Sequence, residues 1–219
     1  MGESLGADWA RAWITASAEV LAENRVALIT LDREIGDGDH GENLERGFSA
    51  VRAKLASQPE DATPGALLKM VATTLISTVG GASGPLLGTA FLKGAGALGD
   101  ATEIDSAGVA AFVAAARDGA VLRGKAEVGD KTMVDALVPL SDTLSREIAG
   151  GATLAAAWRS AADATTAAAE ATKDLLPRMG RARPHAEKSL GTPDAGAYSL
   201  GLIMQSIAAV LAENKEDNK

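Results

Sequence analysis

Apolar residues recur along most of the chain every three or four positions, the spacing that places them on one face of a helix. The two-residue alternation of a half-buried strand is not evident, and residues 26–35 form the one ambiguous run. The pattern therefore predicts an all-α protein. Since neither a fixed-period repeat nor a linker interrupts it, we expect a single domain over residues 1–219, with a polar tail at 213–219.

Residues that start or stop helices divide this pattern into eight segments. The first is expected over 8–30, the second over 43–57 and the seventh over 153–176. Proline in a first turn and Asp or Ser before an apolar stripe are typical helix starts. The starts so identified lie at Pro64, at Pro85, at Asp105 or Ser106, at Asp130 and at Asp194, with a kink expected at Pro139 and a long loop over 178–193. The simplest packing is one layer of antiparallel neighbours around a shared core.

Composition indicates which residues fill the core and which partners are disfavoured. Aromatic residues make up only 3% of the chain and hydrophobic residues 47%, so alanine, leucine and valine must fill the core, with Trp9, Trp13 and Trp158 in it or at an interface. A net charge of −8 disfavours nucleic acid and anionic membranes as partners. Without cysteine there is no thiolate site. With no signal-peptide pattern and no apolar run of about 20 residues, we expect a cytoplasmic protein.

The strongest chemical signal is an acidic loop after the first helix. Asp32, Asp37 and Asp39 lie within eight residues and are separated by glycines, which let the backbone fold tightly enough for the carboxylates to converge. Converging carboxylates repel one another unless a hard cation such as Mg²⁺ lies between them. The alternative is an ordinary solvated turn, in which Asp and Gly are common.

The acidic loop resembles two familiar motifs, and neither of them fits it in detail. Residues 36–41 match G-x-G-x-x-G, but two aspartates would repel a pyrophosphate and the βαβ context is absent. An EF-hand is excluded because glycine stands where its loop needs Asp or Asn. His40 lies within the acidic loop, so a functional role is favoured for it, whereas His185 reads as a loop residue.

Three further loops carry weaker signals. Residues 80–85 place glycines and Ser83 before a helix, which suits either an anion or a plain turn. Residues 124–132 resemble a Walker A loop with one inserted residue, Asp130, and leave Lys131 either near the positive end of a helix or simply solvated. The arginines of 180–185 could contact phosphate or pair with surface carboxylates.

Taken together, the stretches 35–43, 80–86, 129–137 and 180–196 resemble the motifs of the L subunit of dihydroxyacetone kinase, in the same order and over nearly the whole chain. The resemblance implies an eight-helix antiparallel up-and-down barrel with a nucleotide site at one end. It implies that Asp32, Asp37 and Asp39 bind two Mg²⁺ ions. It also assigns the ADP or ATP site to His40, Gly41, Glu42, Asn43, Ala82, Ser83, Gly124, Met133, Arg181, Asp194, Ala195 and Gly196, with Ser83 as a donor to phosphate.

The resemblance further implies a phosphotransferase without a covalent catalytic residue in this chain. The γ-phosphoryl of Mg-ATP would pass to dihydroxyacetone held on a separate K subunit, and an M subunit carrying phosphohistidine would rephosphorylate the bound ADP. A kinase that uses free ATP on a related triose or tetrose ketose is the alternative within this class. In a different class, the chain would be a nucleotide-sensing module that docks on a transcription regulator.

Overall fold

Helices form almost all the regular structure in residues 4–180 and 182–216, which the computed structural model of this protein describes. The α-helices are α1 (Ala7–Glu23), α2 (Arg25–Ile35), α3 (His40–Leu55), α4 (Pro64–Thr78), α5 (Ser83–Leu98), α6 (Ser106–Gly124), α7 (Val134–Ala149), α8 (Leu154–Ala171) and α9 (Ala195–Glu216), and two 3₁₀-helices, η1 (Thr172–Asp174) and η2 (Arg183–Ser189), lie between α8 and α9. One isolated antiparallel bridge joins Leu5 to Ile104. The all-α prediction is confirmed.

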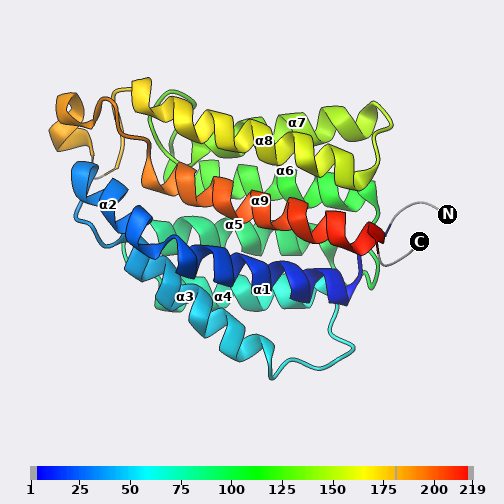
Figure 1. Ribbon diagram of the computed structural model, residues 1–219. Helices are drawn as coiled ribbons and strands as arrows, with labels where there is room; N and C mark the ends of the chain where they lie inside the picture. Colours follow the sequence, from blue (N-terminus) through cyan, green and yellow to red (C-terminus); the bar gives the residue numbers. More distant parts are fainter. Residues whose placement is uncertain (1–3, 181, 217–219) are drawn as a thin grey trace.

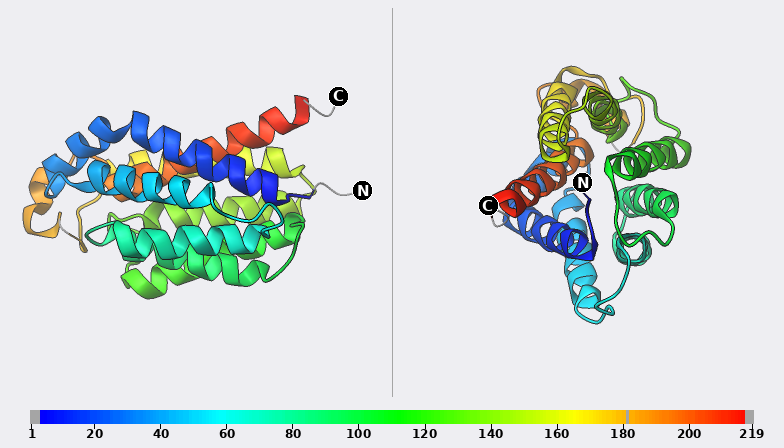
Figure 2. Two further views of the ribbon diagram at one scale, coloured as in Figure 1. Left: turned by 90° about the horizontal axis from the view of Figure 1, so that it is seen from below. Right: turned by 90° about the vertical axis from the view of Figure 1, so that its right-hand side faces the viewer.

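The helices are arranged as a ring of neighbours. From α3 to α9 each helix packs against the next one in the chain, and α1 packs against both α3 and α9, which closes the ring. Figures 1 and 2 show these helices lying side by side along one axis, with α2 prolonging α1 at one end. The arrangement agrees with the expected barrel, and it gathers α2 and η2 at the same end of the molecule.

The expected first helix is broken in two at Asn24. Its side-chain amide donates a hydrogen bond to the carbonyl oxygen of Val20 at 2.8 Å, so the side chain competes with the backbone for a helical acceptor. The chain resumes at Arg25 in a new direction as α2. This break accounts for the ninth α-helix in the described part of the chain, where the sequence predicted eight.

Asp130 does not cap a helix, contrary to expectation. Its carboxylate accepts a hydrogen bond from the backbone N–H of Glu127 at 2.8 Å, within its own loop. The helix that follows, α7, begins at Val134, and its residue Asp135 accepts instead from the N–H groups of Gly129 and Thr132 at 2.5 and 2.7 Å. The other predicted caps are confirmed, since Asp105 accepts from Gly108 and Asp194 from Ala197.

The core is built mainly from small and aliphatic side chains, as the composition predicted. The three tryptophans lie in it, each no more than 5% exposed, and Trp9 stacks on Trp13 with ring centroids 5.4 Å apart. Residues 195–212 of α9 are long and apolar enough, by length and composition, to cross a membrane. In this fold 67% of that window is buried, so the core accounts for its apolar character.

Candidate functional site

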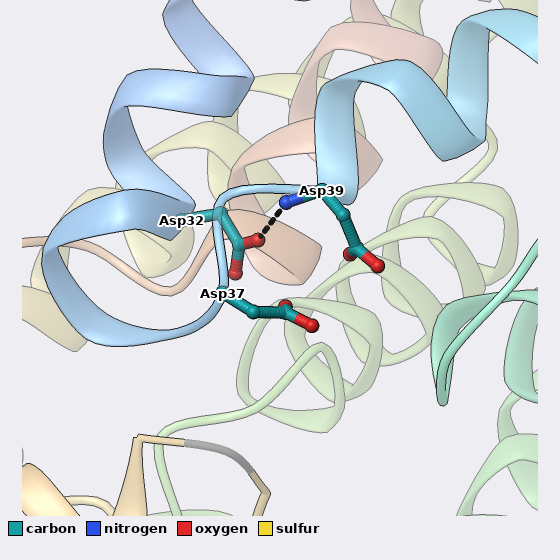
Figure 3. Close-up of side chains that lie close together, drawn as sticks. All are labelled: Asp32, Asp37 and Asp39. Atoms are coloured by element: carbon teal, nitrogen blue, oxygen red, sulfur yellow. Dashed lines mark hydrogen bonds between the residues drawn. The ribbon is translucent and has the colours of Figure 1, made fainter.

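Three carboxylates converge where α2 gives way to α3. Asp32 lies in the last turn of α2, Asp37 in the connecting loop, and Asp39 directly before α3. One carboxylate oxygen from each lies within 4.8 Å of the other two. Figure 3 shows the three side chains turned toward a common space beside the loop. The convergence that the glycine spacing predicted is therefore present.

Backbone contacts hold this acidic loop in its shape. One oxygen of Asp32 accepts hydrogen bonds from the N–H groups of Asp39 and His40, at 2.8 and 3.2 Å, so it caps α3 from the preceding helix (Figure 3). Gly36 allows the close turn, because a Cβ at this position would collide with the Asp32 carboxylate. Gly38 adopts a φ of +75°, which few side chains tolerate.

Helix α3 can begin this close to α2 because its second residue is glycine. A Cβ on Gly41 would overlap the carbonyl oxygen of Arg25 and would lie about 2.9 Å from the side chain of Ile29. The absence of that atom brings the start of α3 against α2, and so brings Asp39 beside Asp32. The role of Gly41 in the described structure is to set the distance between these helices.

The donor set fits a hard divalent cation. Three carboxylates this close together repel one another, and a cation bound between them reverses the sign of their interaction. Mg²⁺ prefers oxygen ligands and is commonly held by one or two carboxylates together with phosphate oxygens. The chemistry of the acidic loop therefore suits a metal-bound polyphosphate better than a bare one.

His40 connects the acidic loop with the second glycine-rich loop and with α9. Its Nδ1 lies 3.1 Å from the hydroxyl oxygen of Ser83, the first residue of α5, and its Nε2 lies 3.0 Å from the hydroxyl oxygen of Ser199. The ring is buried, and burial lowers the pKa of His40, although Asp32 and Asp39 act in the opposite direction. His40 is therefore neutral near pH 7, with one ring nitrogen as donor and the other as acceptor.

The partners of Ser199 decide which nitrogen carries the proton. The Ser199 hydroxyl donates to the carbonyl oxygen of Gly196 at 3.0 Å, so toward His40 it can only accept. Nε2 of His40 is then the donor and Nδ1 the acceptor, and the Ser83 hydroxyl donates to Nδ1. In this arrangement Ser83 presents lone pairs, rather than its proton, to the pocket. A donor role toward phosphate, which the sequence suggested for Ser83, requires this hydrogen bond to be exchanged.

These loops border a pocket with a volume of about 220 Å³. Its polar lining comes from four carboxylates (Asp32, Asp37, Asp39 and Asp194), His40, Ser83, Lys131 and Thr132, and glycines and apolar side chains supply the rest. The apolar residues are Ile35, Leu86, Ala126, Met133, Val134, Met179 and Ala182. A pocket lined by both charged and apolar side chains matches a nucleotide, which has a charged polyphosphate and a flat base.

Asp194 lies on the pocket wall and caps α9. Burial raises the pKa of its carboxyl to about 7, and the nearby charges of Asp135 and Asp32 act in the same direction. The N–H of Ala197 and the ammonium of Lys131 oppose this rise. Asp194 is thus the carboxyl group of the site whose protonation changes near neutral pH.

Lys131 lies just before α7 and lines the pocket, and it is not the solvated lysine that the sequence left open as one alternative. Its side chain is 2% exposed. Its ammonium donates to the carbonyl oxygens of Leu175 and Ser189 at 3.2 and 2.5 Å and to the Ser189 hydroxyl at 3.3 Å. Since an ammonium has three protons, these three acceptors use its donor capacity.

Most of the residues proposed for nucleotide binding line the pocket. They are His40, Ala82, Ser83, Gly124, Met133, Asp194, Ala195 and Gly196, together with the three aspartates. Gly41, Glu42 and Asn43 do not line it. They belong to the first turn of α3, where Glu42 faces Arg25 and Asn43 accepts a hydrogen bond from Arg46. Arg181 lies outside the described residues, and its role stays a prediction.

Several lining residues were not anticipated from the sequence. Leu86, Ala126, Met179 and Ala182 are ordinary apolar residues with no chemical signature, and only the fold brings them to the pocket. Ser199 was missed because it lies in the middle of an apolar helical stretch, where a serine most often bonds only to its own helix. Its position one turn after Asp194 was the available signal.

Comparisons with known proteins identify the family of this chain. The DAK2 domain family matches residues 34–209. The chain is 46% identical over 195 residues to D-erythrulose kinase of Mycolicibacterium smegmatis, a match that covers 88% of this chain and 33% of the relative. It is 38% identical over 201 residues to the ADP-binding subunit DhaL of the PEP-dependent dihydroxyacetone kinase of Escherichia coli, covering 92% of this chain and 95% of the relative.

The chain thus spans about a third of the length of D-erythrulose kinase and nearly all of the E. coli subunit. The fold matches the dihydroxyacetone kinase of C. freundii, solved with AMP-PNP and Mg²⁺, with a TM-score of 0.72 and 22% identity over 95% of this chain and 35% of that one. At this identity the structural match supports the fold alone.

Proposed function

Because this chain belongs to the DAK2 domain family, we propose that it is the nucleotide-binding component of a kinase that phosphorylates a short ketose. The nucleotide is ADP or ATP, and Asp32, Asp37 and Asp39 hold it through two Mg²⁺ ions. The observation that carries the proposal is the convergence of these carboxylates on the lining of a pocket that also presents apolar side chains. The ADP-binding subunits among its relatives, which this chain matches nearly end to end, support the same assignment.

The chemistry that the residues of this chain supply is alignment and charge compensation. Bound Mg²⁺ neutralises the phosphate oxygens and polarises the transferred phosphoryl group. The carboxylates fix the cations, and the backbone N–H groups at the start of α5 add a positive potential on the other side of the pocket. Leu86, Met133 and Met179 offer apolar contact to the base and exclude water from it. No residue of this chain forms a covalent intermediate.

The ketose binds elsewhere. The chain spans about a third of D-erythrulose kinase and of L-erythrulose kinase, and we place the sugar site on a K component. In the form that depends on a phosphotransferase system, an M component carrying phosphohistidine converts bound ADP back to ATP. We propose a cytoplasmic location for the complex.

Binding of magnesium nucleotide tests the proposal directly. ADP should bind the purified chain in a calorimeter when Mg²⁺ is present, and excess EDTA should abolish the heat. Asp37→Asn should weaken this binding by at least about 100-fold, since it removes one carboxylate from a site that neutralises two cations, and should leave the helical circular dichroism unchanged. Asp100→Asn, an exposed position beyond the far end of α5, is the matched control and should bind normally.

Either of two results would contradict the metal assignment: unchanged affinity in Asp37→Asn, or ADP binding that persists in EDTA. Mass spectrometry of the gently released ligand then separates the two forms of the kinase. Stoichiometric ADP that survives dialysis supports a permanently bound cofactor that is rephosphorylated in place, whereas an empty chain supports exchange with free ATP.

A four-carbon ketose is the second candidate substrate. Two of the relatives, at 46% and 42% identity, are D-erythrulose and L-erythrulose kinases. Their identity to this chain is higher than that of the dihydroxyacetone kinase subunits, at 38% and 39%. Turnover assays with the cognate K component, comparing dihydroxyacetone with both erythrulose enantiomers at equal concentration, distinguish the two substrates.

A further inference from the structure

The segment between α8 and α9 leaves the ring of helices and returns to it within a narrow neck. The N–H of Gly191 donates to the carbonyl oxygen of Lys173 at 2.9 Å, and the N–H of Asp194 donates to the Thr172 hydroxyl at 2.8 Å. These bonds join the start of the segment to its end. Between them lies a loop of Ω shape, described over residues 175–180 and 182–189, which we call the strap.

The strap forms part of the pocket lining. Met179, Gly180 and Ala182 are among the pocket-lining residues. The strap is drawn in orange at the left of Figure 1, next to α2, and it contains η2. The position of the strap therefore affects how far the pocket is covered at these residues.

One buried side chain from a distant part of the sequence fastens both ends of the strap. The ammonium of Lys131 bonds to the carbonyl oxygen of Leu175, the first residue of the strap, and to the carbonyl and hydroxyl oxygens of Ser189, the last. The N–H of Arg178 also donates to the carbonyl oxygen of Asp130, the neighbour of Lys131, at 3.2 Å. The loop 125–133 and the strap are thus joined chiefly through this lysine.

Two features of Lys131 are energetically unfavourable, its burial and its backbone conformation. Its side chain is 2% exposed, and burial lowers the pKa of its ammonium, which means that desolvation opposes the charge. Its backbone has a φ of +60°, a left-handed conformation that a side chain of this size disfavours. Because all three donors of this buried lysine bond to the strap, we take holding the strap as the reason for its position. A lysine that served solubility would be exposed, and helix capping would not require these bonds.

We infer that Lys131 is a positioning residue for the nucleotide site, which pins the strap against the pocket that Met179 and Ala182 help to line. Only the effect on nucleotide release rests on the proposed function. The contact between Lys131 and the strap is present in the chain without a ligand. Lys131 lines the pocket as well, but its ammonium donates to Leu175 and Ser189, so it acts on the site through the strap.

Limited proteolysis tests the pin without any nucleotide. Trypsin can cut the exposed strap after Arg178 and Lys188. Lys131→Met should speed cleavage at these two bonds by about tenfold or more, because hydrogen bonds from a charged donor each shift an equilibrium by about that factor. Cleavage within α1 to α8 should stay at the rate of the parent chain. Lys69→Met, at an exposed lysine of α4, is the matched control and should leave strap cleavage unchanged.

Ser189→Ala is the milder second variant, for the case in which Lys131→Met does not fold. It removes the hydroxyl acceptor and keeps the carbonyl, so strap cleavage should rise by a smaller factor in the same direction. Unchanged strap cleavage in the folded variants would overturn the inference. Cleavage that accelerates equally along the whole chain would also overturn it, because that is the signature of global destabilisation.

The consequence for the nucleotide is measured separately. A fluorescent ADP analogue bound with Mg²⁺ should dissociate about tenfold faster from Lys131→Met than from the parent chain, following the same argument. Met179→Ala should also speed dissociation, and the double variant should be no faster than the faster single one, because both act through the strap. Additive effects would overturn the positioning role. If the parent chain binds no nucleotide, the proposed function fails, while the cleavage experiment still decides the pin.

Discussion

At the scale of single residues, Asp194 links the site to pH. The pKa of its carboxyl is raised from an ordinary value of 3.8 to about 7, mainly by burial. Between these two values the folded chain binds the proton more tightly than the unfolded chain does. The contribution of Asp194 to the free energy of unfolding is therefore largest near pH 4 and is lost as the pH rises to about 7.

Replacing this carboxyl with an amide should remove that dependence. Asp194→Asn keeps an acceptor for the N–H of Ala197 and so keeps the cap of α9. Measured by urea unfolding in EDTA, the stability of the parent chain relative to this variant should fall by at most about 4 kcal/mol between pH 4 and pH 8. A difference that stays constant with pH, or that grows, would show that Asp194 is ionised throughout.

The pair His40 and Ser199 gives a second prediction at this scale. Ser199→Ala removes one acceptor for Nε2 of His40, so the ring loses one of the contacts that hold its tautomer toward Ser83. The affinity for magnesium ADP should drop by about 2- to 10-fold, the usual loss for one hydrogen bond. The ¹⁵N chemical shifts of the ring should change from a single Nε2–H tautomer to a mixture.

Ser206→Ala provides the control on the same helix. Ser206 bonds back to the carbonyl oxygen of Ile203 as Ser199 does to that of Gly196, but its other partner is Ser17 of α1. This variant should leave both the affinity and the His40 spectrum unchanged. An equal loss of affinity in both variants would assign the effect to α9 as a whole.

At the scale of elements, glycine positions set the distances between helices. Gly41→Ala places a methyl group against the Arg25 carbonyl and Ile29, so α3 must move away from α2. We expect a loss of about 1–3 kcal/mol in the free energy of unfolding, typical of overpacking, together with weaker binding of Mg²⁺ nucleotide because Asp39 moves with α3. Chemical denaturation and calorimetry measure the two effects.

Gly96→Ala is the matched substitution. Gly96 lies inside α5, and a Cβ there meets no atom within 4 Å. It should stabilise the chain by about 0.5–1 kcal/mol, because alanine loses less backbone freedom than glycine on forming a helix. If Gly41→Ala behaved like Gly96→Ala, the close approach of α2 and α3 would not depend on the missing side chain.

The helix starts also show which features of the fold can be predicted from the sequence. The starts of α4 and α8 were predicted closely because they carry local signals, a capping threonine and, in α4, a proline, whereas α8 ends at Ala171, before the expected residue 176. The start of α3 was predicted three residues late because its cap comes from Asp32, in another helix. The start of α7 was misplaced because Asp135 supports the preceding loop from inside the helix. Local patterns locate caps only where the acceptor is a neighbour in the chain.

The same limit applies to the candidate site. The three aspartates were predicted because their chemistry and spacing are visible within eight residues. The partners of Lys131, at positions 175 and 189, lie 44 and 58 residues away, and no periodicity connects them. The sequence therefore predicts the acidic loop of the pocket, whereas the contacts between Lys131 and the strap depend on the folded ring of helices.

At the scale of the whole molecule, the ring closes only when the two ends of the chain meet, since α1 packs against α9. The pocket lies at one end of that ring, between the α2–α3 loop, the start of α5, the loop before α7, the strap and the start of α9. A ligand that touches all of these segments joins both halves of the chain. Binding should therefore stabilise the fold as a unit, and not one loop alone.

Thermal unfolding measures this coupling. At a free concentration of magnesium ADP near 100 times its Kd, binding adds about 2.7 kcal/mol to the stability of the folded state. For a chain of this size that raises the melting temperature by about 5–10 °C. Removing Mg²⁺ with EDTA should return it to the value of the free chain, because the acidic loop then repels the phosphates. Asp37→Asn should show no rise at the same ADP concentration. A rise that survives both EDTA and this substitution would mean that ADP binds without the acidic loop, and that the segments around the pocket are joined by something other than a metal-bound nucleotide.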